Sequence, residues 1–350
     1  MHKREQTKTI LVTGGSGFFG GIIKQHILDQ GHRCVNVDLV RDPDEHPNLV
    51  HHQVDIREIE KLRAVFAATP IDGVVHCAAI LAHAVNDKKF LWASNVDGTR
   101  NVMDAMRLYG VKQMVFLSSN CLWGEGLGRP VLEDDPPNPV EVYGHSKVAA
   151  ERVIREYSDI TAVIIRCPTI IDFGRLGLLA ILFEFIHDGR RVWTVGKGGN
   201  RYQFIYAGDL ANACMLGLEH PRSETFNIGS DDVKSLAEVY DFVVQRAQSK
   251  SSVAALPLKP TLAAMKLFHH LKISPLGPYH YKMIAEDFVF DTSRIKERLG
   301  WRPTLTNEQV LWRAYQYYSE NRLEIEKRRD VSAHRQGAKM GVIRLLKWIS

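Results

Sequence analysis

The stretch TILVTGGSGFFG, residues 9–20, decides the fold of this chain. Its apolar start predicts a strand, its glycines a turn, and its end the first residues of a helix. Gly14 permits a tight turn, Gly17 lets the backbone approach a pyrophosphate, and Gly20 lets the helix pack on the strand. Phosphates held at such a turn meet the positive N-terminus of the helix. The stretch therefore predicts a dinucleotide-binding turn.

The residue after the next predicted strand indicates which dinucleotide binds. That strand, residues 33–37, is followed by Asp38. A carboxylate there accepts hydrogen bonds from a ribose 2′-hydroxyl and repels a 2′-phosphate, which favours NAD over NADP. Arg41 lies close enough to weaken this preference, and the alternative that Asp38 only caps a turn stays open.

Short apolar runs alternate with segments of helical spacing through the first half of the chain. Strands are predicted at residues 9–12, 33–37, 73–76, 113–118 and 161–166, and helices at residues 18–30, 56–68, 86–109 and 143–157. Such alternation is typical of an α/β protein with a doubly wound parallel sheet, covered by helices on both faces. We expect an NAD-binding core over residues 9–170, completed near residues 203–230. A smaller C-terminal region, mainly residues 171–202 and 231–318, is expected to bind the substrate.

Composition excludes several classes of protein. The five cysteines are scattered and odd in number, so neither a disulfide framework nor a metal site has the spacing that it needs. The apolar run near the N-terminus is too short for a signal peptide, and no run reaches the ~20 apolar residues of a membrane span. We therefore expect a cytoplasmic protein without a metal site.

The positive charge is concentrated at the C-terminus. Of the net charge of +5, residues 320–350 contribute +4, with eight Lys or Arg and four Asp or Glu. The rest of the chain is nearly neutral, which argues against nucleic-acid binding. Residues 319–350 are predicted to form a basic amphipathic tail. The favoured interpretation is that this tail packs on its own domain or is frayed; the alternative is weak contact with an anionic membrane surface.

Tyr143 and Lys147 are the candidate chemical groups. Four residues apart in a predicted helix, they lie on the same face, one turn from each other. A neighbouring ammonium lowers the pKa of a phenol and so favours the phenolate, the form that can accept a proton. Ser118 and Ser119 end a predicted strand, where a hydroxyl can hold the substrate oxygen. The set predicts oxidation of an alcohol or reduction of a ketone.

Further motifs follow in order along the chain, among them HCAA at 76–79, NVDGT at 95–99, SSNCLWG at 118–124, YGHSK at 143–147 and FNIGS at 226–230. With them the chain resembles an extended short-chain dehydrogenase/reductase of the NAD-dependent epimerase/dehydratase family. The resemblance implies a Rossmann sheet of about seven strands with a small C-terminal substrate domain. It also implies a homodimer through the helices predicted at residues 86–109 and 143–157.

The resemblance assigns roles to individual residues. It implies that Asp55 and Ile56 meet the adenine, that Ala78 lies on the ribose side, and that Lys147 binds the nicotinamide ribose. The cofactor site is completed by Phe18, Phe19, Ala79, Tyr143 and Asn95, the last interpreted as a positioning residue. Ser119 aligns with the catalytic Ser or Thr of the family, and Tyr143 would be the acid/base.

The residues after Ser119 limit the reaction. Dehydratases that resemble this family carry Asp-Glu directly after the catalytic residue, and decarboxylases carry a Glu two places after it. Asn120 and Cys121 stand here instead, so an epimerase or a simple oxidoreductase is favoured. Cys121 is also a candidate to exchange a carbon-bound proton, as a cysteine at this place does in some family members; the alternative is that it lines the pocket wall.

Two classes of small-molecule substrate stay open. Thr169, Arg201 and Tyr202 are expected to meet the substrate, with Asn120 and Ser119. Enzymes of this family that act on nucleotide sugars have an arginine where Tyr202 stands, and Arg201 is one place away. A nucleotide-sugar epimerase is the leading hypothesis; the alternative is a hydroxyl/keto oxidoreductase, resembling 3β-hydroxysteroid dehydrogenases, acting on a lipid, steroid-like or polyketide substrate. A third hypothesis is a cofactor-binding scaffold without turnover.

Overall fold

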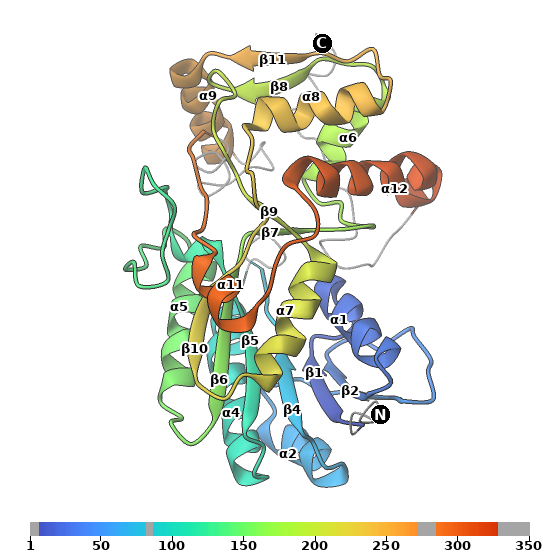
Figure 1. Ribbon diagram of the computed structural model, residues 1–350, viewed down its shortest axis with the longest axis vertical. Coiled ribbons are helices and arrows are strands. Elements are labelled where there is room, and N and C mark those ends of the chain that lie inside the picture. Colours follow the sequence, from blue (N-terminus) through green and yellow to red (C-terminus); the bar gives the residue numbers. More distant parts are fainter. Residues whose placement is uncertain (1–6, 82–86, 272–284, 328–350) are drawn as a thin grey trace.

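The computed structural model describes residues 7–81, 87–271 and 285–327. Its centre is a seven-stranded parallel sheet (Figure 1). The strands are β1 (Thr9–Thr13), β2 (Arg33–Asp38), β3 (Leu49–Gln53), β4 (Gly73–His76), β5 (Gln113–Ser119), β6 (Thr161–Cys167) and β10 (Glu224–Asn227), in the order β10-β6-β5-β4-β1-β2-β3. The five strands predicted from apolar runs are confirmed. The strand order reverses between β1 and β4, which is where a doubly wound sheet binds its ligand.

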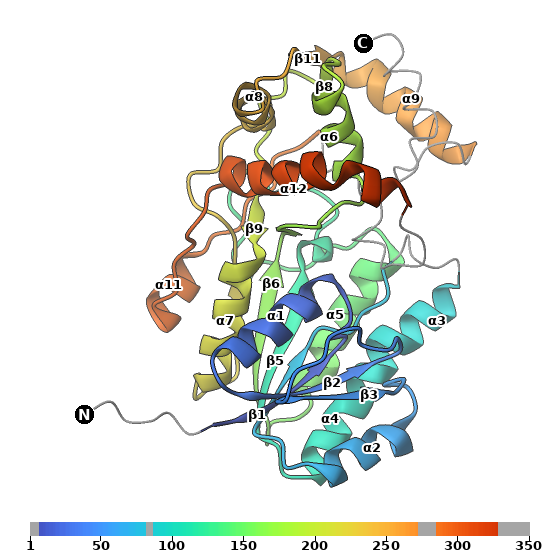
Figure 2. The same cartoon turned by 90° about the vertical axis from the view of Figure 1, so that its right-hand side faces the viewer.

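Helices cover both faces of this sheet (Figure 2). One face is covered by α1 (Phe18–Asp29) and α7 (Ala207–Glu219), and the other by α2 (Ile59–Ala68), α4 (Gly98–Leu108) and α5 (Val142–Arg155). Each layer of helices shares a separate apolar core with the sheet, which is why strands such as β4 are buried along their whole length.

The helix predicted at residues 86–109 has three parts. It runs as α3 (Lys88–Trp92), a π-helical turn η1 (Ala93–Asp97) and α4, while residue 86 lies outside the described residues. Single π turns inserted in a helix often occur at functional sites. Here the π turn contains Asn95, which the sequence assigned to the cofactor site.

The smaller region lies beyond the carboxyl ends of the strands, at the top of Figure 1. It contains α6 (Leu179–His187), β8 (Val192–Val195), α8 (Leu236–Arg246), β11 (Val253–Leu256), α9 (Leu258–His270) and α12 (Asn307–Lys327). Two short parallel strands, β7 (Thr169–Ile171) and β9 (Phe204–Tyr206), connect it to the sheet. A further helix, α11 (Ser293–Leu299), returns to β10. The predicted basic tail lies outside the described residues from residue 328 onward.

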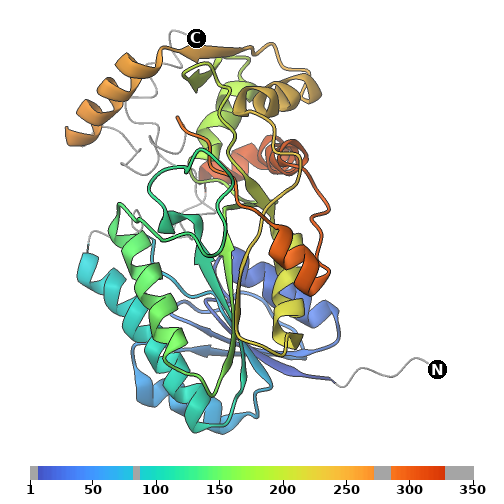
Figure 3. The same cartoon turned by 60° about the vertical axis from the view of Figure 1, so that its left-hand side comes forward.

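A long connection links the two regions on the side seen in Figure 3. After β5, the chain reaches Val131, whose backbone N–H donates to the carbonyl of Val289 at 2.8 Å. Trp123 packs edge-on against the ring of Phe290, with 5.7 Å between ring centroids. These two contacts hold the segment that follows β5 against residues 289–290 of the smaller region.

Among the residues that the structure describes, no helix is long and apolar enough to cross a membrane.

Candidate active site

The glycine turn has the geometry that its sequence predicts. Gly14 has φ of +74°, and a Cβ there would lie 2.9 Å from the backbone of Ala78. The Gly17 N–H donates to the Gly14 carbonyl at 3.0 Å, and any side chain at Gly20 would overlap that carbonyl. Helix α1 begins directly after Gly17. The turn therefore brings a helix N-terminus, free of side chains at its glycines, to the end of β1, which fits a pyrophosphate.

Asp38 lies beside this turn at the end of β2. Its Oδ2 accepts a hydrogen bond from the Ser16 N–H at 2.9 Å, and its Oδ1 accepts one from the Val40 N–H at 3.0 Å. These are bonds of a turn cap, and each carboxylate oxygen keeps a lone pair for a ribose hydroxyl. The cap and the ribose role are thus compatible, since the cap holds the carboxylate next to the glycines.

The other residues assigned to the adenine end lie between β3 and α2. Asp55 forms an ion pair with Arg57 at 2.5 Å; burial raises the pKa of Asp55, but the hydrogen bonds from Arg57 outweigh burial and lower it. Ile56 is buried, and the Ile56 carbonyl accepts a hydrogen bond from Asn101 at 2.9 Å. Asp55 therefore stays ionised at neutral pH.

Asn95 ties the cofactor side of the site to the helix that carries Tyr143. Its Oδ1 accepts from the Ile80 N–H at 2.7 Å, and its Nδ2 donates to the Ser146 hydroxyl at 3.0 Å. The Ser146 hydroxyl in turn donates to the Tyr143 carbonyl at 2.7 Å. Asn95 thus fixes the segment after β4 against the start of α5, as a positioning residue does.

A second buried chain of hydrogen bonds, which motif reasoning missed, supports the segment after β4. The Thr13 hydroxyl lies 2.6 Å from His76 Nδ1, and His76 Nε2 lies 2.9 Å from the Thr99 hydroxyl. Thr13 also accepts from the Ala78 N–H at 3.2 Å. Burial and the nearby Lys147 lower the pKa of His76 to about 3, so its imidazole is neutral. This chain places Ala78 and Ala79 next to the glycine turn.

Tyr143 and Lys147 share one face of α5, as their spacing predicts. Lys147 is only 3% exposed, with its Nζ 4.1 Å from the centre of the Phe116 ring. Burial lowers the pKa of Lys147 to about 8. Burial also raises the pKa of Tyr143, and the thiols of Cys121 and Cys167 act in the same direction, while a hydrogen bond with Ser119 and the charge of Arg175 lower it. Desolvation thus outweighs the lowering of the Tyr143 pKa expected from sequence spacing.

The two serines that end β5 have different surroundings. Ser118 donates to Glu151 at 2.6 Å, and Glu151 is held by Arg166 through two bonds of 2.8 and 3.0 Å. The buried pair of Glu151 and Arg166 joins α5 to β6, and the hydrogen bond to Glu151 keeps the Ser118 side chain in the protein interior. Ser119 instead interacts with Tyr143 and accepts from the Cys121 N–H at 3.1 Å. Ser119 is therefore the serine that lies with the chemical groups.

Three of the residues assigned to the substrate converge on one hydroxyl. The Tyr202 hydroxyl accepts from Asn120 Nδ2 at 3.0 Å and lies 3.1 Å from the Thr169 hydroxyl. Tyr202 comes from the smaller region, whereas Asn120 follows β5, so the hydrogen bond spans the two regions. Arg201 does not join them. It is 56% exposed and forms an ion pair with Asp287 at 3.4 Å.

Arg175 is the charged residue that sequence reasoning did not assign to the site. Its guanidinium carbon lies 5.7 Å from the centre of the Phe18 ring at the start of α1. Burial lowers the pKa of Arg175 to about 10, and the hydroxyls of Tyr202 and Tyr143 both oppose that shift. Arg175 thus lies between the dinucleotide turn and the two tyrosines. The signal for it in the sequence is weak, because it is one arginine in an irregular segment.

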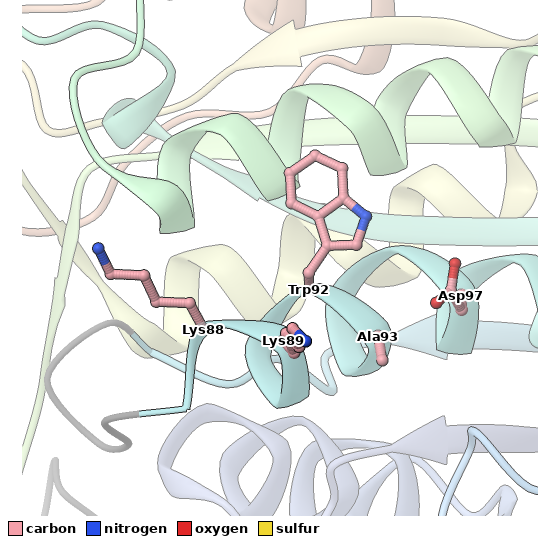
Figure 4. Close-up of a pocket in the computed structure, with 5 residues that line it drawn as sticks. All are labelled: Lys88, Lys89, Trp92, Ala93 and Asp97. Atoms are coloured by element: carbon pink, nitrogen blue, oxygen red, sulfur yellow. The ribbon is translucent and has the colours of Figure 1, made fainter.

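Two further features lie apart from this cluster. Within residues 7–81, 87–271 and 285–327, no group of three or more His, Cys, Asp or Glu could hold a metal ion. A surface pocket on α3 and η1 is lined by Lys88, Lys89, Trp92, Ala93 and Asp97 (Figure 4). None of these five was assigned to cofactor or substrate.

The fold and this site define an NAD-dependent enzyme of the extended short-chain dehydrogenase/reductase type. The family model described as NAD dependent epimerase/dehydratase family matches residues 10–229. The chain belongs to this family.

Relatives match over nearly the full chain. The uncharacterized protein y4nG of Sinorhizobium fredii is 33% identical over 344 residues, which cover 97% of this chain and 86% of that protein. The UDP-glucose 4-epimerase of Streptomyces lividans is 25% identical over 340 residues, covering 89% of this chain and 96% of the relative. The structure of Bordetella bronchiseptica WbmG in complex with NAD has a TM-score of 0.75 at 21% identity, covering 91% of this chain and 96% of that one.

Further relatives are named as UDP-glucose 4-epimerases, and one similar structure is a dTDP-glucose 4,6-dehydratase from Bacillus anthracis in complex with NAD. These comparisons support a family of NAD-dependent sugar epimerases and dehydratases. They do not favour the hydroxysteroid-type alternative.

Proposed function

We propose that the protein is a nucleotide-sugar epimerase, which oxidises a secondary alcohol of the sugar and reduces the ketone from its other face. The observation that carries the proposal is the hydrogen bond from Asn120 to the Tyr202 hydroxyl. Asn120 occupies the place where a dehydratase of this family would carry an acid, and a neutral amide there, already bonded, supplies no proton for loss of water. The many UDP-glucose 4-epimerases among the relatives support the same reaction.

The chain's own residues move one proton. Ser119 holds the substrate oxygen, and Tyr143 takes the proton from the hydroxyl as the carbonyl forms. NAD bound at the glycine turn beside Asp38 would supply the acceptor and donor of the hydride. Tyr143 then gives its proton back to the oxygen, so that no group is consumed in a cycle.

Charge at the site decides how readily Tyr143 loses its proton. Burial raises the pKa of the phenol, and Arg175 lowers it. We propose that Lys147, one helical turn away, holds the nicotinamide ribose and adds positive charge while protonated. We propose that Arg175 and the positive nicotinamide ring together supply the stabilisation that the Tyr143 phenolate needs.

The decisive experiment is mass spectrometry of the small molecules released when freshly purified protein is denatured. Release of NAD with a UDP- or GDP-sugar supports the proposal. A panel of nucleotide sugars should also raise the melting temperature of the wild-type protein, and conversion to the epimer should be lost in Tyr143→Phe. If no nucleotide sugar in the panel shifts the melting temperature and none is released, the proposal fails.

We further propose a homodimer formed through α3, α4 and α5. The surface of α3 and α4 exposes three large apolar side chains, Trp92 at 40%, Leu108 at 60% and Tyr109 at 40%. Figure 4 shows the indole of Trp92 extending from α3 beside the surface pocket. Trp92 lies near the start of the continuous run α3-η1-α4, and Leu108 and Tyr109 lie at its end, so exposed apolar side chains mark both ends of the proposed interface.

A further inference from the structure

A buried ion pair lies beneath the glycine turn and belongs to none of the motifs described above. Lys24, on α1, is 1% exposed, and its Nζ lies 2.5 and 2.6 Å from the two carboxylate oxygens of Asp42. The side chain of Asp42 is fully buried. Burying two charges costs free energy that pairing only partly returns, so a fully buried pair is weak evidence for stability alone. The other contacts of this ion pair show which segments of the cofactor site it holds in place.

Asp42 is connected to the glycine turn through Asn36 of β2. Asn36 Nδ2 donates to Asp42 Oδ2 at 2.5 Å and to the Ser16 hydroxyl at 3.1 Å. On its other side, Asn36 Oδ1 accepts from the Gly15 N–H at 3.0 Å. The amide of Asn36 packs so closely on Gly15 that any side chain there would overlap it. Lys24, Asp42 and Asn36 therefore form one continuous chain of contacts, which we call the latch.

The latch also fixes the loop of residues 39–44, which follows Asp38. The Asp42 N–H donates to His51 Nε2 at 3.2 Å, and the Asp44 N–H donates to Asp42 Oδ1 at 3.1 Å. Asp44 pairs with the same lysine at 2.8 Å. The loop is thus attached to α1 and β3 at its far end.

At its near end the loop is attached to the glycine turn. The Ser16 hydroxyl donates to the Val40 carbonyl at 3.2 Å, and the Ser16 N–H donates to Asp38. Arg41 is exposed between these two attachments. Asp38 can discriminate a ribose hydroxyl from a phosphate only if its carboxylate stays beside the turn. A loop that is free to move would instead bring Arg41 to a 2′-phosphate, for which a guanidinium is a bidentate partner.

We propose that the latch of Lys24, Asp42 and Asn36 holds Asp38 and the loop of residues 39–44 in place, and thereby sets the preference for NAD over NADP. All three are positioning residues, which act through Asp38 and keep Arg41 away from the ribose. The inference concerns the cofactor end of the site and is independent of which sugar the enzyme converts.

The test compares dissociation constants of NAD and NADP by titration calorimetry on the full chain. In Lys24→Met, Asp42 loses its cation and the carboxylate of Asp38 is no longer held beside the turn. NAD should then bind about tenfold more weakly, the effect of losing one charge-assisted hydrogen bond between Asp38 and the ribose. NADP binding should improve, so the dissociation constant of NADP divided by that of NAD should fall by more than tenfold. Asp42→Asn, which keeps the shape of the side chain, should change the ratio in the same direction and serves if Lys24→Met does not fold.

Two further variants separate positioning from general damage. Adding Arg41→Ala to Lys24→Met should remove the gain in NADP binding, because the phosphate partner is gone. Lys8→Met, which breaks the solvent-exposed pair of Lys8 with Glu219, is the matched control and should leave both constants unchanged. An unchanged ratio of the two constants in Lys24→Met and Asp42→Asn overturns the proposal, even if the melting temperature falls.

Discussion

Replacing Lys147 by methionine is expected to make the protein more stable near neutral pH while it removes activity. Lys147 is almost fully buried, and burial lowers the pKa of its ammonium from 10.5 to about 8. Because the unfolded chain keeps the proton up to the higher pKa, it binds more protons than the folded chain between these values. The wild-type free energy of unfolding should therefore rise with pH across this window, by about 3 kcal/mol at ~1.4 kcal/mol per pH unit.

Methionine has a similar length and carries no charge, so the variant should not have the free-energy cost of burying an ammonium. It also loses the contact between the ammonium and the Phe116 ring, which is worth about 1 to 2 kcal/mol when desolvated. The net gain in unfolding free energy near neutral pH should then be roughly 1 to 2 kcal/mol, disappearing toward the pKa of the unfolded lysine.

The assay is urea unfolding followed by circular dichroism, at about pH 7 and about pH 10. The matched control is Lys112→Met, whose side chain is 56% exposed and which should show no such pH-dependent difference from wild type. If Lys147→Met and wild type gain the same stability between the two pH values, the ammonium is not buried at this cost. The reasoning on Lys147 would then be refuted.

Four other changes test the catalytic and assembly proposals. Tyr143→Phe should lower kcat by about 10²- to 10⁴-fold, the usual contribution of a general acid/base, while calorimetry still detects NAD binding; normal turnover would contradict its role. Arg175→Met should shift the rise of kcat to higher pH, since a positive charge that lowers the Tyr143 pKa is lost; an unshifted pH profile would exclude this role. Turnover in D₂O should leave no deuterium on carbon, as nuclear magnetic resonance of the product can show, whereas incorporation would assign proton exchange to Cys121. Trp92→Glu should convert the proposed dimer to a monomer in light scattering, and a wild-type monomer would refute the interface.

Local sequence determines the parts of the site that were predicted. The glycine turn needs three residues without side chains between a strand and a helix, so Gly14, Gly17 and Gly20 become recognisable once the preceding strand and the acid at Asp38 are read with them. The shared face of Tyr143 and Lys147 follows from helical periodicity alone. The predicted strands are confirmed for the same reason, because buried parallel strands are continuous apolar runs. Strand β3 lacks that signal, since its sequence LVHHQ is polar and half-exposed at the edge of the sheet.

Contacts between distant segments determine the parts that were not predicted. Arg175 approaches Phe18, Tyr143 and Tyr202 only because β7 pairs with β9 and carries the following segment over the sheet. No periodicity in an irregular segment encodes that path. Thr13 and His76 belong to different strands, and their contact follows from the parallel register of β1 and β4 rather than from any motif.

The largest difference between the sequence prediction and the structure concerns the pKa of Tyr143. Sequence spacing places an ammonium one turn from Tyr143 and so predicts a lowered pKa of the phenol, but spacing says nothing about desolvation. In the folded chain burial raises the pKa of Tyr143 and lowers that of Lys147, so each group becomes easier to keep neutral. A positive charge brought near Tyr143 lowers its pKa most effectively where water is excluded. The base should therefore be activated by charges that close around it, Arg175 and the nicotinamide ring, and its activity should depend on the presence of the oxidised cofactor.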